Sequence, residues 1–255
     1  MGELKAVLFD VDGTLAETER HGHLPAFNQA FKEFGLDWHW SAELYGELLA
    51  VTGSLERTHH YVKAYNADYQ SVNPDLGALL SEVIARKNEI YIEIVDGGSI
   101  PLRPGVERVL RETHNSDVRM AIVTTTSHRN VQSLLETNIG GDVMEWFDVV
   151  AAGNIVENKK PAADIYRLAL KELNLPAENC LAIEDSQNGV QSAQAAGVPC
   201  MVISSEYSDG HDLSGAQLIV DEWGAAGLPM EVISGDAGEY AMVGLDLMCE
   251  LMSRI

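Results

Sequence analysis

Two aspartates separated by a single residue, Asp10 and Asp12, offer the clearest chemistry in the sequence. They follow the apolar run 6–9, which predicts a buried strand. Side chains two apart on an extended chain point the same way, so the two carboxylates should meet at the carboxyl end of that strand. One carboxylate can attack phosphorus to form an acyl phosphate, while the other donates and accepts a proton. A single pair of this kind is equally compatible with an acidic turn that ends a strand.

A second acidic pair, Glu184 and Asp185, follows another apolar run, 180–183. It would add carboxylates at the same edge of a parallel sheet. Oxygen ligands from Asp10, Asp12 and Asp185 would suit Mg²⁺, which binds a few carboxylates together with waters and a substrate phosphate. Taken alone, the second pair could also be acids that complement a helix N-terminus.

Hydroxyls and a lysine follow two further apolar runs. Thr124 and Thr125 come after run 120–123, where hydroxyls and free amides before a helix can bind phosphate. Ordinary helix capping is the alternative. Lys160, directly before Pro161, could neutralise a phosphate and an acyl phosphate, although a surface lysine before a proline is common. Each signal is weak by itself, but four at successive strand ends indicate an active site.

The elements that must position these residues alternate along the chain. Helix-period segments around Val106, Val131 and Ile165 lie between apolar runs that are typical of strands buried on both faces. The runs are 6–9, 120–123, 147–150, 180–183 and 200–203. This alternation predicts an α/β fold built on a doubly wound parallel sheet.

The segment 17–96 departs from that alternation because its apolar residues repeat with helical periods. Apolar residues share one helical face in 26–34, which Gly35 is placed to end, and again in 75–91. We therefore expect an inserted α-helical cap domain at 17–96. The core domain would then comprise 1–16 and 97–255.

The segment after Ser204 has a less regular pattern. The apolar residues 218–220 predict a last strand, and 242–252 predict a last amphipathic helix. Glycine and acidic residues between them indicate a loop. No function for this segment follows from the sequence.

The charge of the chain excludes several classes of partner. Its formal net charge is −22, whereas nucleic acids and anionic membranes are bound by clustered Lys and Arg. We expect neither as a partner. The acidity also fits a well-solvated surface. A phosphorylated substrate would need a local basic pocket and a metal to offset the general repulsion.

Cysteine use and hydropathy indicate the compartment. Cys180, Cys200 and Cys249 are odd in number and have no metal-binding or redox spacing, and the first two lie in apolar runs typical of a core. The sequence shows no secretory pattern at its start and no apolar run of membrane-spanning length. We expect a cytoplasmic protein that acts as a monomer.

The four signals occur in an order that resembles the haloacid dehalogenase (HAD) superfamily over residues 4–203: Asp-x-Asp-Gly-Thr, then Thr, then Lys-Pro, then Glu-Asp. The resemblance implies a HAD-like Rossmannoid core with a type 1 cap. It implies Asp10 as nucleophile and Asp12 as general acid and base, with a backbone oxygen of Asp12 on Mg²⁺. Thr124 and Lys160 match its phosphate-binding positions. The metal-binding positions are matched by Asp185, directly, and by Glu184, through water.

The expected cap further resembles the CbbY-type sugar-bisphosphate phosphatases, which act on xylulose-1,5-bisphosphate. The stretches that carry this likeness are Ala16–Glu19, Gly22-His23, Ala26–Asn28, Gly35–Trp40, Leu44–Gly53 and Ala151–Gly153. By this likeness Glu19, His23 and Arg57 would face the substrate, with Thr125 at the core. The family commonly has Gly-Gly-Lys-Glu-Arg where this chain has Gly-Ser-Leu-Glu-Arg, so Leu55 removes a candidate contact for a second phosphate.

These expectations combine into a Mg²⁺-dependent phosphatase acting on a sugar phosphate or bisphosphate, bound where cap meets core, through a phosphoaspartyl intermediate. A β-phosphoglucomutase-like phosphomutase is the nearest alternative, although Thr14 is more typical of phosphatases. A dehalogenase would have little use for Asp12 or Asp185. A non-catalytic binding module on the same fold is a further alternative, against which the intact set of motif residues argues.

Overall fold

The computed structural model describes residues 3–72 and 75–255. The chain divides into two compact units. One, the core unit, comprises Met1–Glu17 and Pro101–Ile255, and the other, the helical unit, comprises Thr18–Ile100. The identification of the helical unit as a cap domain with bounds 17–96 stays a prediction.

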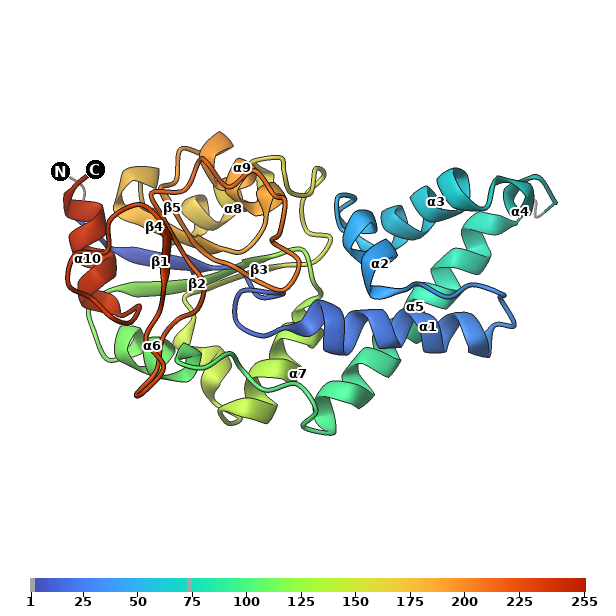
Figure 1. The fold of residues 1–255 in the computed structure, drawn as a ribbon, viewed down its shortest axis with the longest axis horizontal. Helices are drawn as coiled ribbons and strands as arrows, with labels where there is room; N and C mark the ends of the chain where they lie inside the picture. The colour runs from blue at the N-terminus through green and yellow to red at the C-terminus, as the bar shows by residue number, and fades with distance from the viewer. Residues whose placement is uncertain (1–2, 73–74) are drawn as a thin grey trace. The chain divides into compact units, whose positions relative to one another are not determined.

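A mostly parallel sheet forms the centre of the core unit (Figure 1). Within the described residues it has seven strands in the order β3-β2-β1-β4-β5-β6-β7, of which only β7 is antiparallel to its neighbour. The strands are β1 (Ala6–Phe9), β2 (Arg119–Thr124), β3 (Val149–Ala152), β4 (Cys180–Glu184), β5 (Cys200–Ile203), β6 (Leu218–Val220) and β7 (Val232–Ser234). The predicted doubly wound α/β fold is confirmed.

The parallel register brings the expected functional residues to one edge of the sheet. Phe9, the last residue of β1, lies opposite Ile122 of β2 and Ile183 of β4. Since parallel strands point the same way, the residues that follow these positions all emerge at the carboxyl edge. The pairing of β1 with β4 therefore places Glu184 and Asp185 beside Asp10.

The strand predicted at 147–150 begins two residues later than expected. A 3₁₀ turn, Val143–Trp146, occupies the chain just before it, and Phe147 N–H donates to the Met144 carbonyl. Asp148 instead accepts at its carboxylate from Arg119 Nε at 2.8 Å. Asp148 N–H still donates to the Met120 carbonyl at 2.9 Å, but Met120 N–H donates to the Asp148 carboxylate at 3.3 Å, so the regular ladder begins only at Val149.

Helices cover both faces of the sheet. In Figure 1, α8 (Asp164–Leu173) and α9 (Gln187–Ala195) lie on one side, and α6 (Val106–His114) and α7 (His128–Asn138) lie on the other. The apolar residues around Val106, Val131 and Ile165 are buried against the sheet, as their spacing predicted. The core between the sheet and its helices thus fixes the loops at the carboxyl edge.

The segment after β5 contains more structure than its sequence pattern indicated. The strand at 218–220 is confirmed as β6, but β7 was not expected, since Val232 and Ile233 are exposed and give no buried apolar run. The last helix, α10, spans Leu245–Ser253 and begins three residues later than predicted. Its start is delayed because Val243 N–H bonds to the Trp223 carbonyl and Gly244 is extended.

The helical unit contains a π-helical turn, Glu19–His23, followed by five α-helices within its described residues. These are α1 (Leu24–Glu33), α2 (Ala42–Leu48), α3 (Ser54–Tyr65), α4 (Ala67–Val72) and α5 (Leu76–Asp96). The two predicted helices correspond to α1 and α5, which pack side by side (Figure 1). Gly35 has φ 67° just after α1, a left-handed conformation that suits glycine at a helix end.

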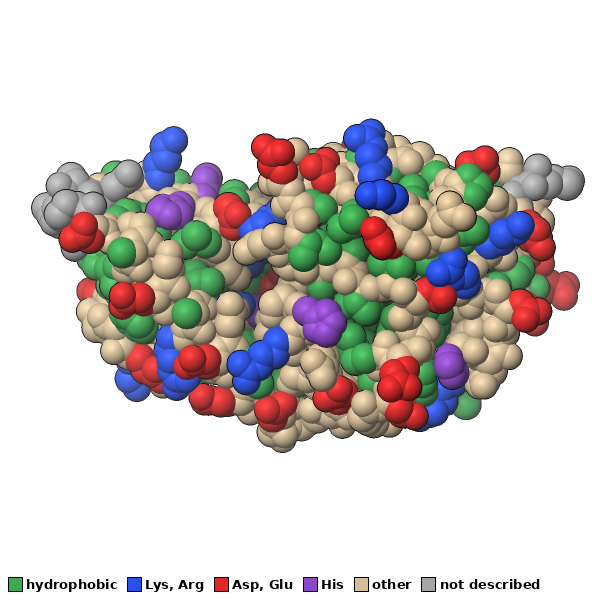
Figure 2. Space-filling view, turned by 180° about the vertical axis from the view of Figure 1, so that it is seen from behind, with side chains coloured by type: hydrophobic (Ala, Val, Ile, Leu, Met, Phe, Trp, Pro, Cys, Tyr) green, Lys and Arg blue, Asp and Glu red, His purple; other side chains and the backbone are tan. Residues whose placement is uncertain are grey.

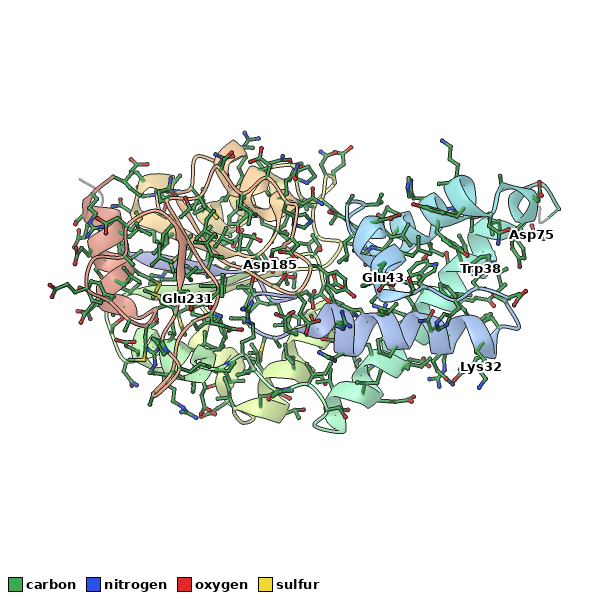
Figure 3. All side chains as sticks on the ribbon, in the orientation of Figure 1. Lys32, Trp38, Glu43, Asp75, Asp185 and Glu231 are labelled. Atoms are coloured by element: carbon green, nitrogen blue, oxygen red, sulfur yellow. The ribbon has the colours of Figure 1, made fainter. Side chains whose placement is uncertain are left out.

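An aromatic cluster holds the helical unit together. Trp40 lies 4.6 Å from Phe27 and 4.9 Å from Phe31, measured between ring centroids. Trp38 packs edge-on to Phe31 and lies among the helices of this unit, whereas Lys32 points to its outside (Figure 3). Aromatic burial of this kind gives much of the apolar area that a small helical unit needs.

Surface charge is dispersed on the face that Figure 2 shows, where Lys and Arg side chains are scattered among Asp and Glu. That dispersion gives no continuous basic stripe on this face for a nucleic acid backbone to follow. Among the described helices, none combines the length and apolar content needed to cross a bilayer.

Candidate active site

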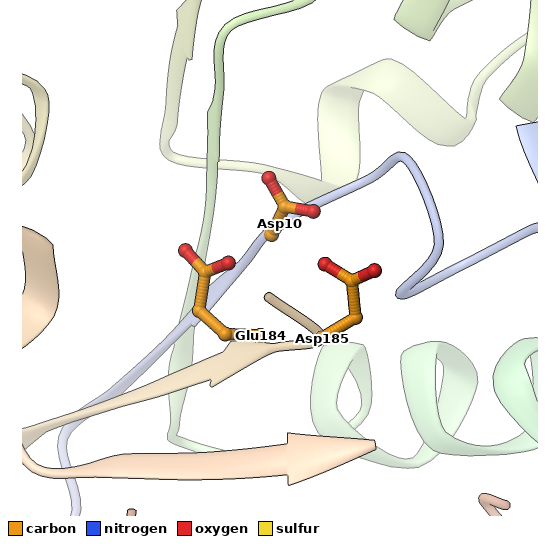
Figure 4. A group of neighbouring side chains, drawn as sticks. All are labelled: Asp10, Glu184 and Asp185. Atoms are coloured by element: carbon orange, nitrogen blue, oxygen red, sulfur yellow. The ribbon is translucent and has the colours of Figure 1, made fainter. Parts of the chain in front are cut away.

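Three carboxylates converge at the carboxyl edge of the sheet (Figure 4). Asp10 comes from the end of β1, and Glu184 and Asp185 come from the end of β4. The Asp10 N–H still bonds to the Ile183 carbonyl at 3.0 Å, so the pairing of β1 with β4 extends to the site itself. Parallel pairing thus brings together residues that are more than 170 positions apart.

Lys160 lies inside this group. Its ammonium is 2.7 Å from Asp10 Oδ1 and 2.6 Å from Glu184 Oε1, and it also donates to the Val123 carbonyl at 2.8 Å. The side chain is 5% exposed. All its donors therefore point at the sheet edge, and the surface-lysine alternative is wrong.

The chemistry of the donors fits a divalent cation. One oxygen from each of Asp10, Glu184 and Asp185 lies within 4.8 Å of the others, and all three residues are buried. Lys160 forms ion pairs with two of these carboxylates, Asp10 and Glu184. Glu184 Oε2 is buried without a hydrogen-bond partner. Hard oxygen ligands with excess negative charge are the environment that Mg²⁺ occupies.

The pKa values of the site follow from this excess of buried carboxylates. Burial raises the pKa of Asp10 well above its ordinary value, against the opposing charge of Lys160. Burial likewise raises the pKa of Asp185 to about 7, although a hydrogen bond from Ser205 acts in the other direction. Burial alone would lower the pKa of Lys160, but the charges of Asp10 and Glu184 raise it. The lysine is therefore cationic, and the carboxylates need further positive charge to ionise together.

Two glycines allow the chain to approach the carboxylates closely. A Cβ on Gly13 would lie 2.1 Å from Asp185 Oδ2, and one on Gly189 would lie 1.8 Å from Glu184 Oε2. Gly13 also has φ 84°, where side chains other than glycine are strained. Both positions therefore require glycine for the carboxylates to hold their places.

The loop that carries the two aspartates is tightly closed. Gly13 N–H donates to the Ala16 carbonyl at 2.8 Å, and Thr14 Oγ1 donates to Asp10 Oδ2 at 3.2 Å. Asp12 is half-buried, and its carboxylate is not among the three that cluster. Its expected roles, proton transfer and a backbone oxygen for Mg²⁺, stay predictions.

Thr124 is the last residue of β2, and Thr125 follows it at the same edge. Thr124 is buried and its hydroxyl accepts from Thr126 N–H at 3.3 Å, whereas Thr125 is half-buried. Ser127 caps α7 by accepting from Asn130 N–H. Capping is thus carried out by Ser127, and phosphate binding by the two threonines stays a prediction.

Glu19 and Arg57 meet in the helical unit through Tyr45. The Tyr45 hydroxyl donates to Glu19 Oε2 and accepts from Arg57 Nη1 at 2.9 Å. The Arg57 guanidinium lies 4.0 Å from Glu19 Oε2 and also donates to the Val51 carbonyl. Tyr45 was not singled out as a functional residue, because a single tyrosine in a short helix has no distinctive spacing.

His23 pairs with a buried lysine that sequence reasoning missed. Lys87 Nζ lies 2.8 Å from His23 Nδ1, and the imidazole stacks on Tyr91 with centroids 4.1 Å apart. Lys87 is 2% exposed. A signal was present, since Lys87 interrupts the apolar face that Leu80, Val83 and Tyr91 form on α5.

Two core residues near the site were also missed. Tyr166, buried on α8, donates its hydroxyl to Glu184 Oε1 at 2.5 Å. Ser205 donates to Asp185 Oδ2 at 2.7 Å. Neither lies in a motif, and only the folded arrangement shows that they hold Glu184 and Asp185.

Comparison with known proteins places this arrangement in a family. The haloacid dehalogenase-like hydrolase family model matches residues 4–197. CbbY of Cereibacter sphaeroides is 40% identical over 231 residues, covering 89% of this chain and 97% of that protein. A plasmid-encoded CbbY of Cupriavidus necator is 41% identical over 245 residues, covering 93% of each.

A solved structure extends the likeness to three dimensions. The crystal structure of a CbbY variant from Rhodobacter sphaeroides in complex with xylulose-1,5-bisphosphate matches with a TM-score of 0.80 at 40% identity. The match covers 88% of this chain and 99% of that chain. The family match over most of the sequence and the close CbbY relatives show that this chain belongs to the haloacid dehalogenase-like hydrolases.

Proposed function

We propose that this hydrolase is a Mg²⁺-dependent phosphatase that forms a phosphoaspartyl intermediate on Asp10. The observation that carries the proposal is the contact of Lys160 with Asp10 and Glu184 inside a group of three buried carboxylates. A carboxylate that is oriented by an ammonium on one oxygen and by a hydroxyl on the other is a fixed nucleophile. Lys160 is also placed to offset charge on a phosphoryl group that reaches Asp10.

The reaction needs two proton transfers, which we assign to Asp12. In the first step an Asp10 oxygen forms a bond to phosphorus as the bond to the leaving oxygen breaks, and Asp12 gives that oxygen its proton. In the second step Asp12 takes a proton from the water that attacks phosphorus. Asp10 is thereby restored and inorganic phosphate is released.

The metal would be held by Asp10, Asp12 and Asp185, with Glu184 nearby. When bound, Mg²⁺ supplies positive charge for the transferring phosphoryl group and for the carboxylates themselves. The raised pKa of Asp185, about 7, supports this assignment, because burial disfavours its charge unless a cation compensates.

The substrate we propose is a sugar phosphate or bisphosphate. Support comes from the CbbY relative that was crystallised with xylulose-1,5-bisphosphate. We assign recognition of the sugar to Glu19, His23 and Arg57. Thr125 would also contact the substrate. Glu19 and Arg57 are bridged by Tyr45, so their side chains are pre-oriented rather than loose.

The test is phosphate release from a panel of sugar mono- and bisphosphates with Mg²⁺, beside matched reactions with EDTA. We expect Mg²⁺-dependent release, with xylulose-1,5-bisphosphate among the substrates. Products should also be separated, because a phosphomutase of the same fold would return an isomeric sugar phosphate. An isomer without released phosphate, or release that EDTA leaves unchanged, would contradict the proposal.

A further inference from the structure

Three consecutive carbonyls of the loop after Asp12 each accept a hydrogen bond from outside the loop. The Arg103 side chain donates from Nη1 to the Gly13 carbonyl at 2.6 Å. Trp223 donates from its indole Nε1 to the Thr14 carbonyl at 2.9 Å. Arg103 N–H donates to the Leu15 carbonyl at 2.9 Å. Arg103 and Trp223 thus fix the backbone of residues 13–15, directly after the two aspartates.

Arg103 is itself held by the segment after β5. Its guanidinium is 3% exposed, and it donates to the Ser204 carbonyl at 2.6 Å and to the Asp221 carbonyl at 2.8 Å. Glu222 Oε2 lies 3.1 Å from Nη2 and Glu17 Oε1 lies 3.5 Å from Nη1, so two carboxylates compensate the charge. A buried arginine with this many acceptors has a single orientation, because each lost bond would leave a desolvated donor.

Trp223 is equally constrained. Its side chain is fully buried, and its ring lies 6.3 Å from that of Phe9, the residue before the nucleophile. Gly105 allows close packing beside it, since a Cβ there would lie 2.3 Å from the Gly224 carbonyl oxygen. The segment 221–224 therefore packs against both the start of α6 and the loop that follows Asp10.

The position of this loop determines the geometry of the site. Gly13 passes so close to Asp185 that a Cβ would lie 2.1 Å from Oδ2, and the next residue, Thr14, donates to Asp10. A small displacement of the Gly13 or Thr14 carbonyl would move both carboxylates. Misplacement of reacting groups by about 1 Å can lower a rate by about 100-fold.

We propose that the segment Ser204–Trp223, which lies beyond the residues matched by the family model, is part of the catalytic machinery. Trp223, and Glu222 acting through Arg103, are positioning residues that hold Asp10 and Asp185 in register for the cation and the phosphoryl group. This inference rests on the proposed phosphatase function. It gives the segment after β5 a role beyond completing the sheet.

The test compares Trp223→Phe, which keeps an aromatic ring but removes the indole N–H, with Trp146→Phe. Trp146 is a half-buried tryptophan of the same unit that stacks on His114, so it controls for the loss of an indole. The measurements are Mg²⁺ affinity by titration calorimetry and kcat and KM for p-nitrophenyl phosphate. We expect Trp223→Phe to lower Mg²⁺ affinity and kcat by about 10-fold each with little change in KM. Trp146→Phe should stay within about 2-fold of the parent protein.

Glu222→Gln provides a second variant, because its side chain is 35% exposed and the substitution should not impair folding. We expect a decrease of about 3-fold in Mg²⁺ affinity, which Glu222→Asp partly restores. Unchanged Mg²⁺ affinity and kcat in folded Trp223→Phe would overturn the inference. If Trp223→Phe does not fold, the same result in Glu222→Gln would overturn it. If the parent protein released no phosphate, the proposed function would fail, and the Mg²⁺ titrations would still decide whether Trp223 and Glu222 position the carboxylates.

Discussion

The polar groups of the core unit and those of the helical unit are held in different ways. In the core unit, Asp10 and Glu184 come from strand ends and meet Lys160, from the loop between β3 and α8, at the edge of the sheet. In the helical unit, Glu19 and Arg57 meet through Tyr45 beside an aromatic cluster. The sheet edge concentrates like charges that require a cation, whereas the helical cluster pairs opposite charges internally.

This difference matches two tasks of the proposed enzyme, which are phosphoryl transfer and recognition of a substrate. An excess of carboxylates around one ammonium creates a demand for positive charge, which suits phosphoryl transfer. A balanced group held by a tyrosine can change its partners without leaving a net buried charge, which suits recognition of a substrate. Changes in the core unit should therefore abolish the reaction, and changes in the helical unit should redirect it.

The largest effect is expected for Lys160→Met, which removes the ammonium between Asp10 and Glu184. Phosphate release should fall by about 10³-fold, because the phosphoryl charge and the nucleophile lose the same partner. Lys159→Met is the matched control, since it removes the adjacent, half-buried lysine. It should keep the rate within about 3-fold. Similar losses in both variants would show that Lys160 has no special role.

Two glycines near helix N-termini allow the two units to be compared directly. Gly189, in the first turn of α9, has no room for a Cβ beside Glu184, whereas nothing lies within 4 Å of a Cβ on Gly77 in α5. Gly189→Ala should lower Mg²⁺ affinity by about 10-fold or more, because Glu184 must move. Gly77→Ala should leave it unchanged and raise the unfolding free energy by about 0.5–1 kcal/mol.

Calorimetric Mg²⁺ titration and urea unfolding of both variants provide the measurement. Equal Mg²⁺ affinities would contradict the close approach of α9 to the carboxylate. A loss of stability in Gly77→Ala would contradict the open surroundings of that position.

The buried carboxylates of the core unit also predict a pH dependence. The pKa of Asp185 is about 7 in the metal-free protein, above its value in an unfolded chain, so folding disfavours its ionised form. The contribution of Asp185 to the unfolding free energy is therefore largest below about pH 4. It falls as the pH rises toward about 7 and stays constant at higher pH. Asp10 acts in the same direction.

Urea unfolding in EDTA at about pH 5 and about pH 8 measures this decline. Asp185→Asn should reduce the decline by on the order of 1–4 kcal/mol, and Mg²⁺ should reduce it in the parent protein. An identical decline in the parent protein and in Asp185→Asn would rule out this carboxylate as its source.

The smallest effect is expected in the helical unit, at Leu55. The resemblance to sugar-bisphosphate phosphatases leads us to expect lysine at this position, and Leu55→Lys would supply a cation for a second phosphate. The ratio of kcat/KM for bisphosphate to that for monophosphate should rise by about 5-fold, as for one exposed ion pair. Leu55→Met is the uncharged control and should leave the ratio unchanged. A ratio that is equal in the two variants would remove this position from substrate selection.

The sequence predicted most of the core unit, because its chemistry is local to strand ends. Apolar runs located the parallel strands, and parallel strands necessarily present their next residues at one edge. Asp10, Glu184 and Asp185 were found in this way, although β3 was placed two residues early, whereas Lys160 was found as a lysine before a proline in the loop between β3 and α8. Their partners Tyr166 and Ser205 were not, since a hydroxyl that reaches a carboxylate across the fold has no signature in spacing.

The limit of prediction from sequence is clearer in the segment after β5 and in the polar groups of the helical unit. Trp223 contributes through one indole N–H to a carbonyl 209 positions away, which no periodicity records. Lys87 was detectable as a charge on an apolar helical face, but its contact with His23 depends on how the π-helical turn Glu19–His23 packs against α5. Local patterns thus identify the functional residues at strand ends. The residues that hold them in place depend on tertiary packing.

The most direct test of the account is the identity of the residue that carries the phosphoryl group. The protein should be mixed with Mg²⁺ and a phosphorylated substrate, quenched in acid and treated with borohydride, which reduces an acyl phosphate of aspartate to homoserine. Peptide mass spectrometry should then find homoserine at position 10, only with substrate, and never in Asp10→Asn. Homoserine at another aspartate, or full phosphatase activity in Asp10→Asn, would contradict the assignment of Asp10 as nucleophile.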